Sequence, residues 1–338
     1  MTDHDLQTLS LLDPVDVDEL RRQPPPPVPV RFWLEPDPPP VRGGWRRRPL
    51  RVAGGAVAVA AVVAIGVNLL SGATDRSSPA AVQALESVAG IASAQAGAAV
   101  PPEFIYSRVT SSTLVTSDPA PGYSYLLPTT TETWIAQDGS GRVRERVDAP
   151  AFVGPRDRRR WIANGSPTLT EQPAGTVHDQ VLGAHDLDGV APGAEGLPPT
   201  YRLPTDPDAL RTALRRAASQ SEVPVDVKTF ELASAVLMQA GSSPQLRSAL
   251  FRVVSTIPGV VLRGEVTDPR GRRGTGVSIT SDYSGAAQRD TLIFDAETSQ
   301  PLASVTTLDE PQPWIDGTEL GSVVLDASDG TESARVRP

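Results

Sequence analysis

The sequence contains no cysteine in 338 residues, and aromatic residues make up only 5 % of it. The absence of thiols excludes disulfides, thiolate metal sites, cysteine nucleophiles and a lipidated N-terminal cysteine. A chain of this length can bury a core without such covalent links, and 39 % of its residues are apolar. We therefore expect an ordinary hydrophobic core and no thiol chemistry.

Lysine is also scarce, although thirty arginines are present, and the familiar catalytic motifs are missing. Lys228 is the single lysine, and the formal net charge of −9 argues against a general nucleic-acid binder. No GxSxG, HExxH, GxxxxGKS/T, GxGxxG or SxxK pattern occurs in the sequence. The sequence therefore indicates no catalytic residue and no cofactor site, and we expect a protein that is not an enzyme.

One long apolar run stands out, from Val52 to Leu70. Its nineteen residues contain no charge and a single polar side chain, Asn68. As a helix the run would span about 28 Å, close to the roughly 30 Å hydrocarbon layer of a membrane. Arginines crowd its N-terminal flank, and the positive-inside rule places that flank in the cytoplasm. These topology-determining residues are Arg42, Arg46, Arg47, Arg48 and Arg51.

A buried core helix and a cleaved signal peptide are the two alternatives to an uncleaved anchor. The run is apolar around the whole helix and longer than a usual signal-peptide core, which favours the anchor. The predicted layout is a cytoplasmic head with a proline-rich linker (1–48), a transmembrane helix (49–71), an exported domain (72–310) and a C-terminal tail (311–338). We expect a single-pass protein integral to the plasma membrane, with an extracytoplasmic C-terminal domain.

The cytoplasmic head is short and rich in proline. Runs at 24–27 and 38–40 flank the sequence RFWLEP and predict an extended linker that packs no core. The apolar group Phe32, Trp33 and Leu34 is either a docking motif for an unidentified cytosolic partner or an apolar bump near the membrane.

The exported part alternates helix and strand signals. Ser78-Pro79 is typical of a helix start. Strands are predicted at residues 103–115, 125–136 and 142–147, and the last two are expected to form a hairpin around the turn sequence DGSG. Residues 159–163 read as a further short strand, and 164–204 as a long surface excursion.

Three helices and a strand meander follow. The helices are expected between residues 205 and 257, with Thr205 and Ser243 as N-caps. Four strands are expected at 260–267, 275–282, 289–294 and 302–307, and VVLDASD in the tail reads as one more. The predicted fold is α+β, an antiparallel curved sheet of half-barrel type with a cluster of helices packed on it.

This order of elements, with the turn sequence FDAETSQPLASV from Phe294 to Val305, resembles exported half-barrel domains of the lipoprotein-carrier type, whose relatives include periplasmic regulators of anti-sigma factors. Three segments, 125–145, 203–215 and 246–272, resemble an actinobacterial family of membrane-anchored proteins of unknown function. The resemblance implies the curved sheet and brings no catalytic residue. The head is shorter than a full anti-sigma domain, so contact with a sigma factor stays open.

One group of polar residues has metal-ligand chemistry. HDQVLGAHDLDG places His178 and His185 near Asp179, Asp186 and Asp188. Imidazole and carboxylate are suitable ligands, but the seven-residue spacing matches no known metal motif, so a solvated loop is the preferred interpretation and no metal site is predicted. By the same reasoning Trp134, Trp161 and Tyr201 are assigned to the core or a sheet face, and the arginines at 156–160 to a solvated turn.

Two functions fit these observations. The first is a non-catalytic envelope sensor or adaptor, whose exported domain binds a protein or an apolar ligand. The second is a lipid or lipoprotein chaperone, in which the helices form a lid over acyl chains. Methionine is common at adaptable apolar surfaces, which favours a lid slightly. The candidate apolar ligand face comprises Phe230, Leu237, Met238 and Leu250; if these residues fill the sheet instead, the first function is favoured.

Overall fold

A computed structural model describes residues 76–96, 103–117, 122–136, 138–184, 197–239, 242–282, 285–312, 315–331 and 333–334. The chain divides into two units, Met1–Asn68 and Leu69–Pro338, and all described residues belong to the second. The expected transmembrane helix, its flanking arginines and the cytoplasmic head lie outside the described residues. Among the described helices, none is both long and apolar enough to cross a membrane.

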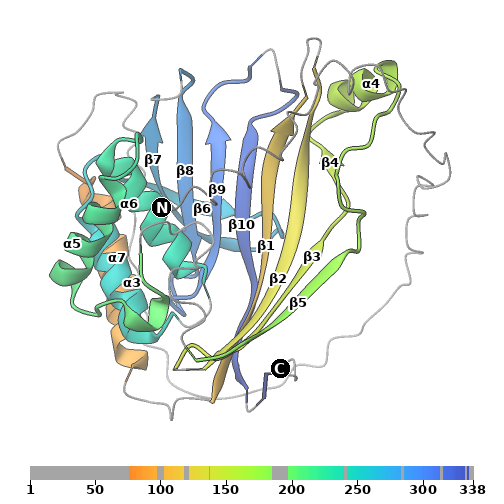
Figure 1. The fold of residues 1–338 in the computed structure, drawn as a ribbon. Coiled ribbons are helices and arrows are strands. Elements are labelled where there is room, and N and C mark those ends of the chain that lie inside the picture. The colour runs from red at the N-terminus through yellow and green to blue at the C-terminus, as the bar shows by residue number, and fades with distance from the viewer. Residues whose placement is uncertain are drawn as a thin grey trace, which may run out of the picture. The chain divides into compact units, whose positions relative to one another are not determined.

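The second unit is built on a ten-stranded antiparallel sheet, so the α+β prediction is confirmed. The strands are β1 (Phe104–Thr116), β2 (Ser124–Ala136), β3 (Gly141–Val147), β4 (Ala151–Phe152), β5 (Val177–Leu182), β6 (Val261–Thr267), β7 (Arg273–Ser281), β8 (Gln288–Phe294), β9 (Pro301–Leu308) and β10 (Glu319–Thr331). They run in the order β5-β3-β2-β1-β10-β9-β8-β7-β6, with β4 beside β2. Figure 1 shows this order from β7 to β5 across the sheet.

The C-terminal strand lies in the middle of the sheet. β10 pairs with β1 from Phe104↔Thr331 to Thr113↔Gly321, and on its other side with β9. The boundary expected at residue 310 therefore does not separate this strand from the fold. The single strand expected within the tail is longer than VVLDASD and joins the N-terminal hairpin to the predicted meander β6–β9.

Helices begin where the local sequence predicts. α3 (Pro79–Gln95) and α7 (Pro244–Ser255) each start at a proline that follows a capping serine. The hydroxyl oxygens of Ser78 and Ser243 each accept a 3.2 Å hydrogen bond from the backbone N–H three residues later in the chain. This bond satisfies an N–H group that would otherwise be unpaired at the start of the helix. α5 (Pro207–Ala218) is capped by Asp206 and not by the expected Thr205, and α6 (Val225–Leu237) follows Pro224.

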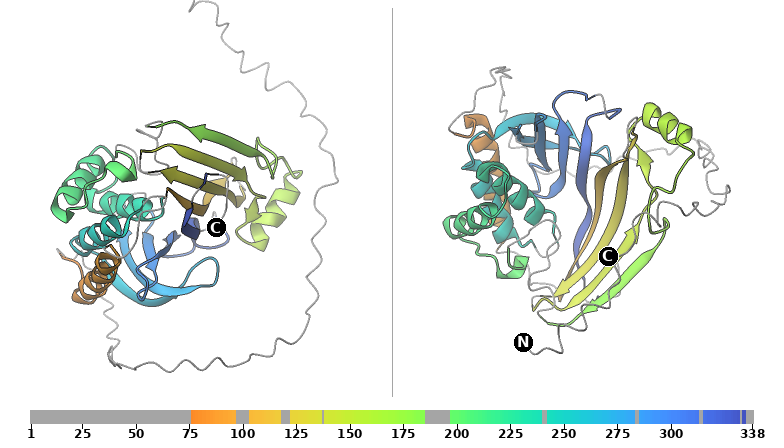
Figure 2. Two further views of the ribbon diagram at one scale, coloured as in Figure 1. Left: turned by 90° about the horizontal axis from the view of Figure 1, so that it is seen from below. Right: turned by 45° about the horizontal axis from the view of Figure 1, so that its top comes forward.

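These four helices cover one half of one sheet face. They share the main hydrophobic core with β7 and β8, and Phe251 of α7 meets Phe294 of β8 edge-on at a centroid distance of 5.2 Å. Within the described residues, the core reaches as far as Val109 on β1 and Val323 and Leu325 on β10. Figure 2 shows the sheet curving around the helices, with β2, β3 and β5 beyond them. We call β6–β9 the covered half, and β1, β2, β3 and β5 the open half.

The opposite face, here the back face, has its own small cluster. Ile293, Ala303 and Val324 are buried there against Val266 of the β6–β7 hairpin. The turn of this hairpin is held by Arg272, which bonds Asp268 and donates to the backbone oxygens of Leu325 (2.9 Å) and Leu302 (3.0 Å). The hairpin therefore ties β6 and β7 to the centre of the sheet.

Two local expectations were wrong. Residues 159–163 belong to a helix, α4 (Pro155–Ala163), because both carboxylate oxygens of buried Asp157 accept backbone N–H bonds, from Ser124 (3.1 Å) and Asp316 (3.0 Å). The excursion at 164–204 contains the edge strand β5 and a 3-10 turn, Thr200–Arg202. The 3.6-residue and two-residue patterns were weak in both segments, since few of their side chains are buried.

Candidate functional site

The predicted apolar ligand face belongs to the core. Relative exposure is 0 % for Phe230 and Leu250, 1 % for Leu237 and 2 % for Met238. All four lie in the main cluster between the helices and the covered half of the sheet. Within the described residues they are packed side chains that fill this part of the sheet, not the lining of an open cavity.

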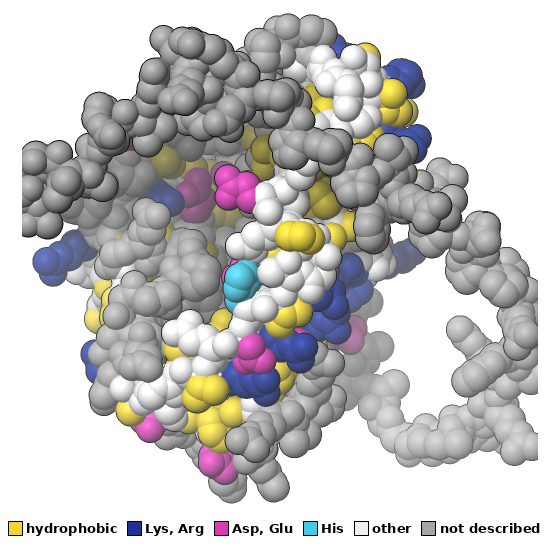
Figure 3. Space-filling view, turned by 45° about the vertical axis from the view of Figure 1, so that its right-hand side comes forward, with side chains coloured by type: hydrophobic (Ala, Val, Ile, Leu, Met, Phe, Trp, Pro, Cys, Tyr) yellow, Lys and Arg dark blue, Asp and Glu magenta, His cyan; other side chains and the backbone are white. Residues whose placement is uncertain are grey.

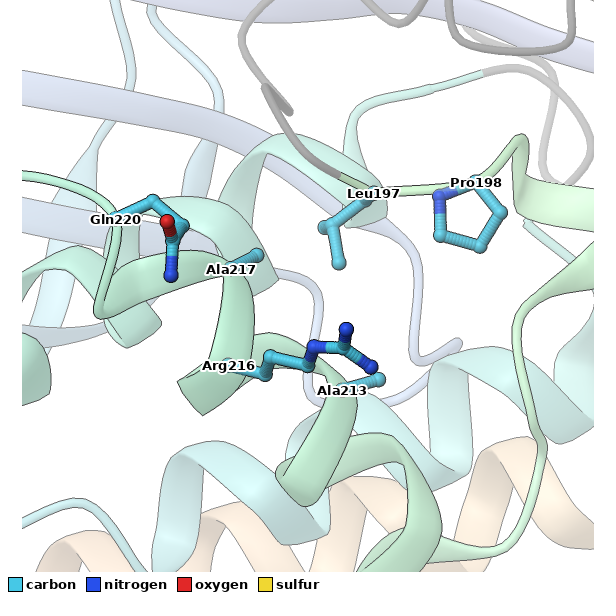
Figure 4. A pocket seen from close by; sticks show the side chains of 6 residues that line it. All are labelled: Leu197, Pro198, Ala213, Arg216, Ala217 and Gln220. Carbon is cyan, nitrogen blue, oxygen red and sulfur yellow. The ribbon is translucent and has the colours of Figure 1, made fainter.

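A small cavity lies elsewhere, on the outer helix of the cluster. It has a volume of about 410 Å³ and opens between α5 and the segment at Leu197–Pro198. Figure 4 shows the residues that line it: Leu197, Pro198, Ala213, Arg216, Ala217 and Gln220. Arg216 and Gln220 give it polar groups that could hold a small anion, but none of the four predicted ligand residues reaches it.

The open half presents a second surface, on the same face as the helices. Alternation along β2 places Thr129, Thr131 and Thr133 on this face, because Thr131 pairs with Val109, which contacts the main core. All three threonines are half-buried. Opposite them, β3 contributes Val143 and Glu145. This threonine surface mixes hydroxyl groups with aliphatic side chains and lies beyond the helix cover.

The back face of the open half carries a ladder of side chains across four strands. The ring of Tyr106 on β1 lies 5.1 Å from that of Trp134 on β2, and its hydroxyl donates to buried Glu132 at 2.9 Å. The guanidinium of Arg142 on β3 stands 5.7 Å from the Trp134 ring and bonds Asp179 on β5 through two nitrogens. Cation–π contact and a bidentate ion pair together fasten β5 to the sheet.

The ion pair at the end of this ladder shifts the pKa values of both Arg142 and Asp179 in the directions expected for an ion pair. The hydrogen bond to Asp179 raises the pKa of Arg142, and the same bond lowers the pKa of the Asp179 carboxyl. Both side chains are solvent-accessible, so the pair positions the strand more than it stabilises the fold.

A second charged group joins the back face to the β6–β7 turn. Arg270 bonds Asp326 at 2.8 Å and also donates to the Thr110 hydroxyl, which itself donates to Asp326 at 2.6 Å. Burial acts to raise the pKa of Asp326, but the hydrogen bonds from Arg270 and Thr110 outweigh it and hold the pKa below its usual value. These contacts are structural links between elements far apart in sequence.

The carboxyl group of Asp290 is buried, and among the described residues no cation is in hydrogen-bond contact with it. Asp290 on β8 accepts a 2.6 Å hydrogen bond from the Thr306 hydroxyl. Burial raises its pKa to about 6; the Thr306 bond lowers it and the charge of Glu231 raises it further. Lys228, which pairs with Glu231 at 3.2 Å, offsets part of this effect. Asp290 is therefore a titrating group at the edge of the helix cover.

The predicted histidine pair is only half described. His178 lies on strand β5, not in a loop, and its Nε2 is 2.9 Å from the Gln172 side-chain oxygen. His185, Asp186 and Asp188 lie outside the described residues, as does the side chain of Tyr201. In the described ranges no group of three or more histidines and carboxylates is placed to hold a metal ion.

The structure agrees with the assignment of Trp134 but not with that of the arginines at 156–160. Trp134 is buried, as expected for a sheet-face residue, and Trp161 on α4 donates its indole N–H to the Pro167 carbonyl at 2.9 Å. The arginines at 156–160 lie on the helix α4, not in a turn. The threonine surface and the β5 edge were not singled out from the sequence, although the continuous polar run TTTET on β2 was read as part of a strand.

No protein-family model matches the chain, and no curated protein matches it in sequence. The resemblance to half-barrel carriers and to an actinobacterial membrane-anchored family therefore stays a prediction.

Proposed function

We propose that this chain is a non-catalytic, membrane-anchored envelope protein whose exported domain acts as a sensor or adaptor by binding a partner protein. The observation that carries the proposal is the contrast between a filled helix core and a helix-free threonine surface on the same sheet face. A filled core leaves the open half as the broad described surface available for recognition.

The chemistry of the threonine surface suits a protein partner. Thr129, Thr131 and Thr133 offer hydroxyl groups that donate and accept hydrogen bonds, and each is only half-buried. Val143 and Glu145 beside them add aliphatic area and a negative charge. Such mixed, partly polar patches are typical of non-obligate interfaces, whereas an acyl-chain site needs a concave apolar lining.

The alternative, a lipid or lipoprotein chaperone, has less support. It depended on a lid formed by Leu237 and Met238 over a cavity, and both side chains are packed in the core. The cavity beside Leu197 has about 410 Å³ and carries Arg216 and Gln220 at its wall, which suits a small polar ligand better than an acyl chain.

Membrane anchoring completes the proposal. The uncharged run at 52–70, with arginines on its N-terminal side, would hold the domain at the outer surface of the plasma membrane and leave the head inside. An engaged exported domain could then be reported to a cytosolic protein through the apolar group at 32–34.

Site-specific photo-crosslinking in cells tests the proposal. A photoreactive residue replaces Thr131 on the threonine surface, and in a matched control it replaces exposed Thr212 on α5. We expect a discrete protein adduct from position 131 and none from position 212, identified by mass spectrometry. Adducts of position 131 with lipids alone would support the chaperone, and identical adducts from both positions would contradict a specific site.

A further inference from the structure

Strand β5 is an edge strand with exposed aliphatic side chains. It ends the strand order, and of its six residues only Leu182 is buried. Val181 is 79 % exposed and Val177 41 %, and every second backbone N–H and C=O of an edge strand points away from the sheet. Such an edge is a template for pairing with another strand.

The side chains of β5 are symmetric about Asp179. Pairing with β3 places Val177, Asp179 and Val181 on the back face, opposite Arg146, Arg144 and Arg142. The sequence Val-x-Asp-x-Val reads the same in both directions. In an antiparallel pair of two such strands with Asp179 at the centre, Val177 of each copy faces Val181 of the other.

We propose that two copies of this chain dimerise through antiparallel pairing of their β5 strands about a two-fold axis at Asp179. The pairing satisfies the outward backbone groups of both strands and covers all four exposed valines. On the other face His178 meets Gln180 of the second copy, a pair that can hydrogen-bond. The inference goes beyond the proposed function, since it needs no foreign partner.

Charge complementarity favours a second copy as the occupant. The axis brings two Asp179 carboxylates together, which alone would be unfavourable. Each is already bound by two nitrogens of Arg142, and Arg144, directly opposite Asp179, has no ion-pair partner among the described residues. Four guanidinium groups would then surround two carboxylates.

The remaining charges on this face do not oppose the pairing. Arg146 is paired with Asp148 at 2.7 Å, and buried Glu132 lies between Arg108 and Arg144 in the strand register. Figure 3 turns this side of the molecule forward and shows basic side chains next to hydrophobic ones. One strand pair is a small interface, so we expect a weak dimer that anchoring in one membrane strengthens.

Because the chain has no cysteine, single-cysteine variants test the register directly. Across the proposed axis the two Cα atoms of residue 179 would lie about 4.5–5.5 Å apart, within disulfide range. The two Cα atoms of residue 177 would lie roughly 14 Å apart, since they are four residues out of register. Full-length Asp179→Cys and Val177→Cys chains are oxidised in membranes and separated by non-reducing electrophoresis.

The expected result is a disulfide-linked dimer for Asp179→Cys and monomer for Val177→Cys. Co-expression of Val177→Cys with a differently tagged Val181→Cys chain should give the mixed dimer. A Val177→Cys and Val181→Cys pair that gives no mixed dimer, or a Val177→Cys chain that cross-links equally when expressed alone, overturns the proposal.

A variant without cysteine guards against loss of folding. Val181→Arg places a charge at the proposed interface, and Val261→Arg makes the same change on β6 at the opposite edge, where Val261 is 36 % exposed. Sedimentation of the full-length protein in detergent should show at least a tenfold weaker dimer for Val181→Arg and no change for Val261→Arg. A dimer unaffected by Val181→Arg, or disrupted by Val261→Arg, contradicts pairing through β5.

Discussion

The two halves of one sheet are stabilised by different physical means. The covered half buries a continuous apolar cluster under α3, α5, α6 and α7, so burial of apolar surface stabilises it. The open half has long paired strands, β1 and β2, with Thr, Ser and charged side chains between the apolar ones. Its strands are held together by backbone pairing, and side-chain links such as Trp134–Arg142–Asp179 position β5 against them.

This difference separates the roles of the two halves. Side chains in the covered half are packed against many neighbours, so changes there act on folding. On the helix-side face of the open half, Thr129, Thr131 and Thr133 are only half-buried, so changes there should act on recognition. The predictions below test whether this division holds.

The largest effect is expected from Leu237→Glu in the covered half. Leu237 is fully enclosed by the core, and a carboxylate there would have no partner, which costs roughly 5 kcal/mol or more. We expect the purified exported domain to lose its cooperative thermal transition by circular dichroism. Thr212→Glu on the exposed side of α5 is the control and should melt like the wild type. A folded Leu237→Glu domain would return the helices to the role of a lid.

A backbone change should break the open half. Gly141 begins β3, and a Cβ there would lie 1.8 Å from the Trp134 carbonyl oxygen. We expect Gly141→Ala to lower the free energy of unfolding by about 3 kcal/mol, because the strand must shift. Gly90→Ala is the matched control, since a Cβ at Gly90 meets no atom within 4 Å in helix α3 and should stabilise by roughly 0.5–1 kcal/mol. Equal stability of the two variants in urea would argue against this register.

Asp290→Asn should stabilise the covered half at neutral pH. The folded pKa of about 6 lies above the ordinary 3.8, so the folded state binds more protons. Stability is highest below pH 4 for this group and falls as the pH rises to about 6, by about 3 kcal/mol in total. The amide keeps an acceptor for Thr306 and carries no charge. We expect a gain of roughly 2 kcal/mol at pH 7 and none at pH 4, measured by urea unfolding; a gain of the same size at both pH values would contradict the titration.

The smallest effect is expected from Thr131→Ala on the threonine surface. The side chain is half-buried and lies beyond the helix cover, so the free energy of unfolding should change by no more than about 0.5 kcal/mol. Chemical denaturation measures this directly. A loss above 2 kcal/mol would show that the open half is not a binding surface but part of the core.

The fold was predictable where the signal is local. Ser-Pro steps at 78–79 and 243–244 identified two helix starts, and regular alternation identified the meander β6–β9. The helix α4 was not predicted, because Asp157 is its one buried residue and therefore no apolar pattern marks it. The Asp157 carboxylate is held by the backbone N–H groups of Ser124 and Asp316, which are distant in sequence. The place of β10 between β1 and β9 is likewise set by pairing across the whole domain.

The candidate site was less predictable for a different reason. Apolar periodicity in α6 and α7 shows that one side of a helix is covered, but not whether protein or ligand covers it. Leu237 and Met238 therefore fitted a lid and a core equally well. The sequence of the threonine surface predicted a strand but not a binding surface. The exposure of these side chains depends on how far the helices extend over the sheet, which the sequence of β2 does not show.

Strand β10 also fixes an order of events during synthesis. The ribosome makes β1 about 200 residues before residues 319–331 and β9 shortly before them, and neither strand has its inner neighbour until β10 is made. Until then no strand joins the two halves of the sheet, because the partners of β1 on this side, such as Thr331 opposite Phe104, have not yet been made. In a chain exported as proposed, passage through a translocation channel requires an unfolded polypeptide, and a domain completed too early would block it. In such an exported chain, the sheet would be completed only after residues 319–331 had crossed the membrane.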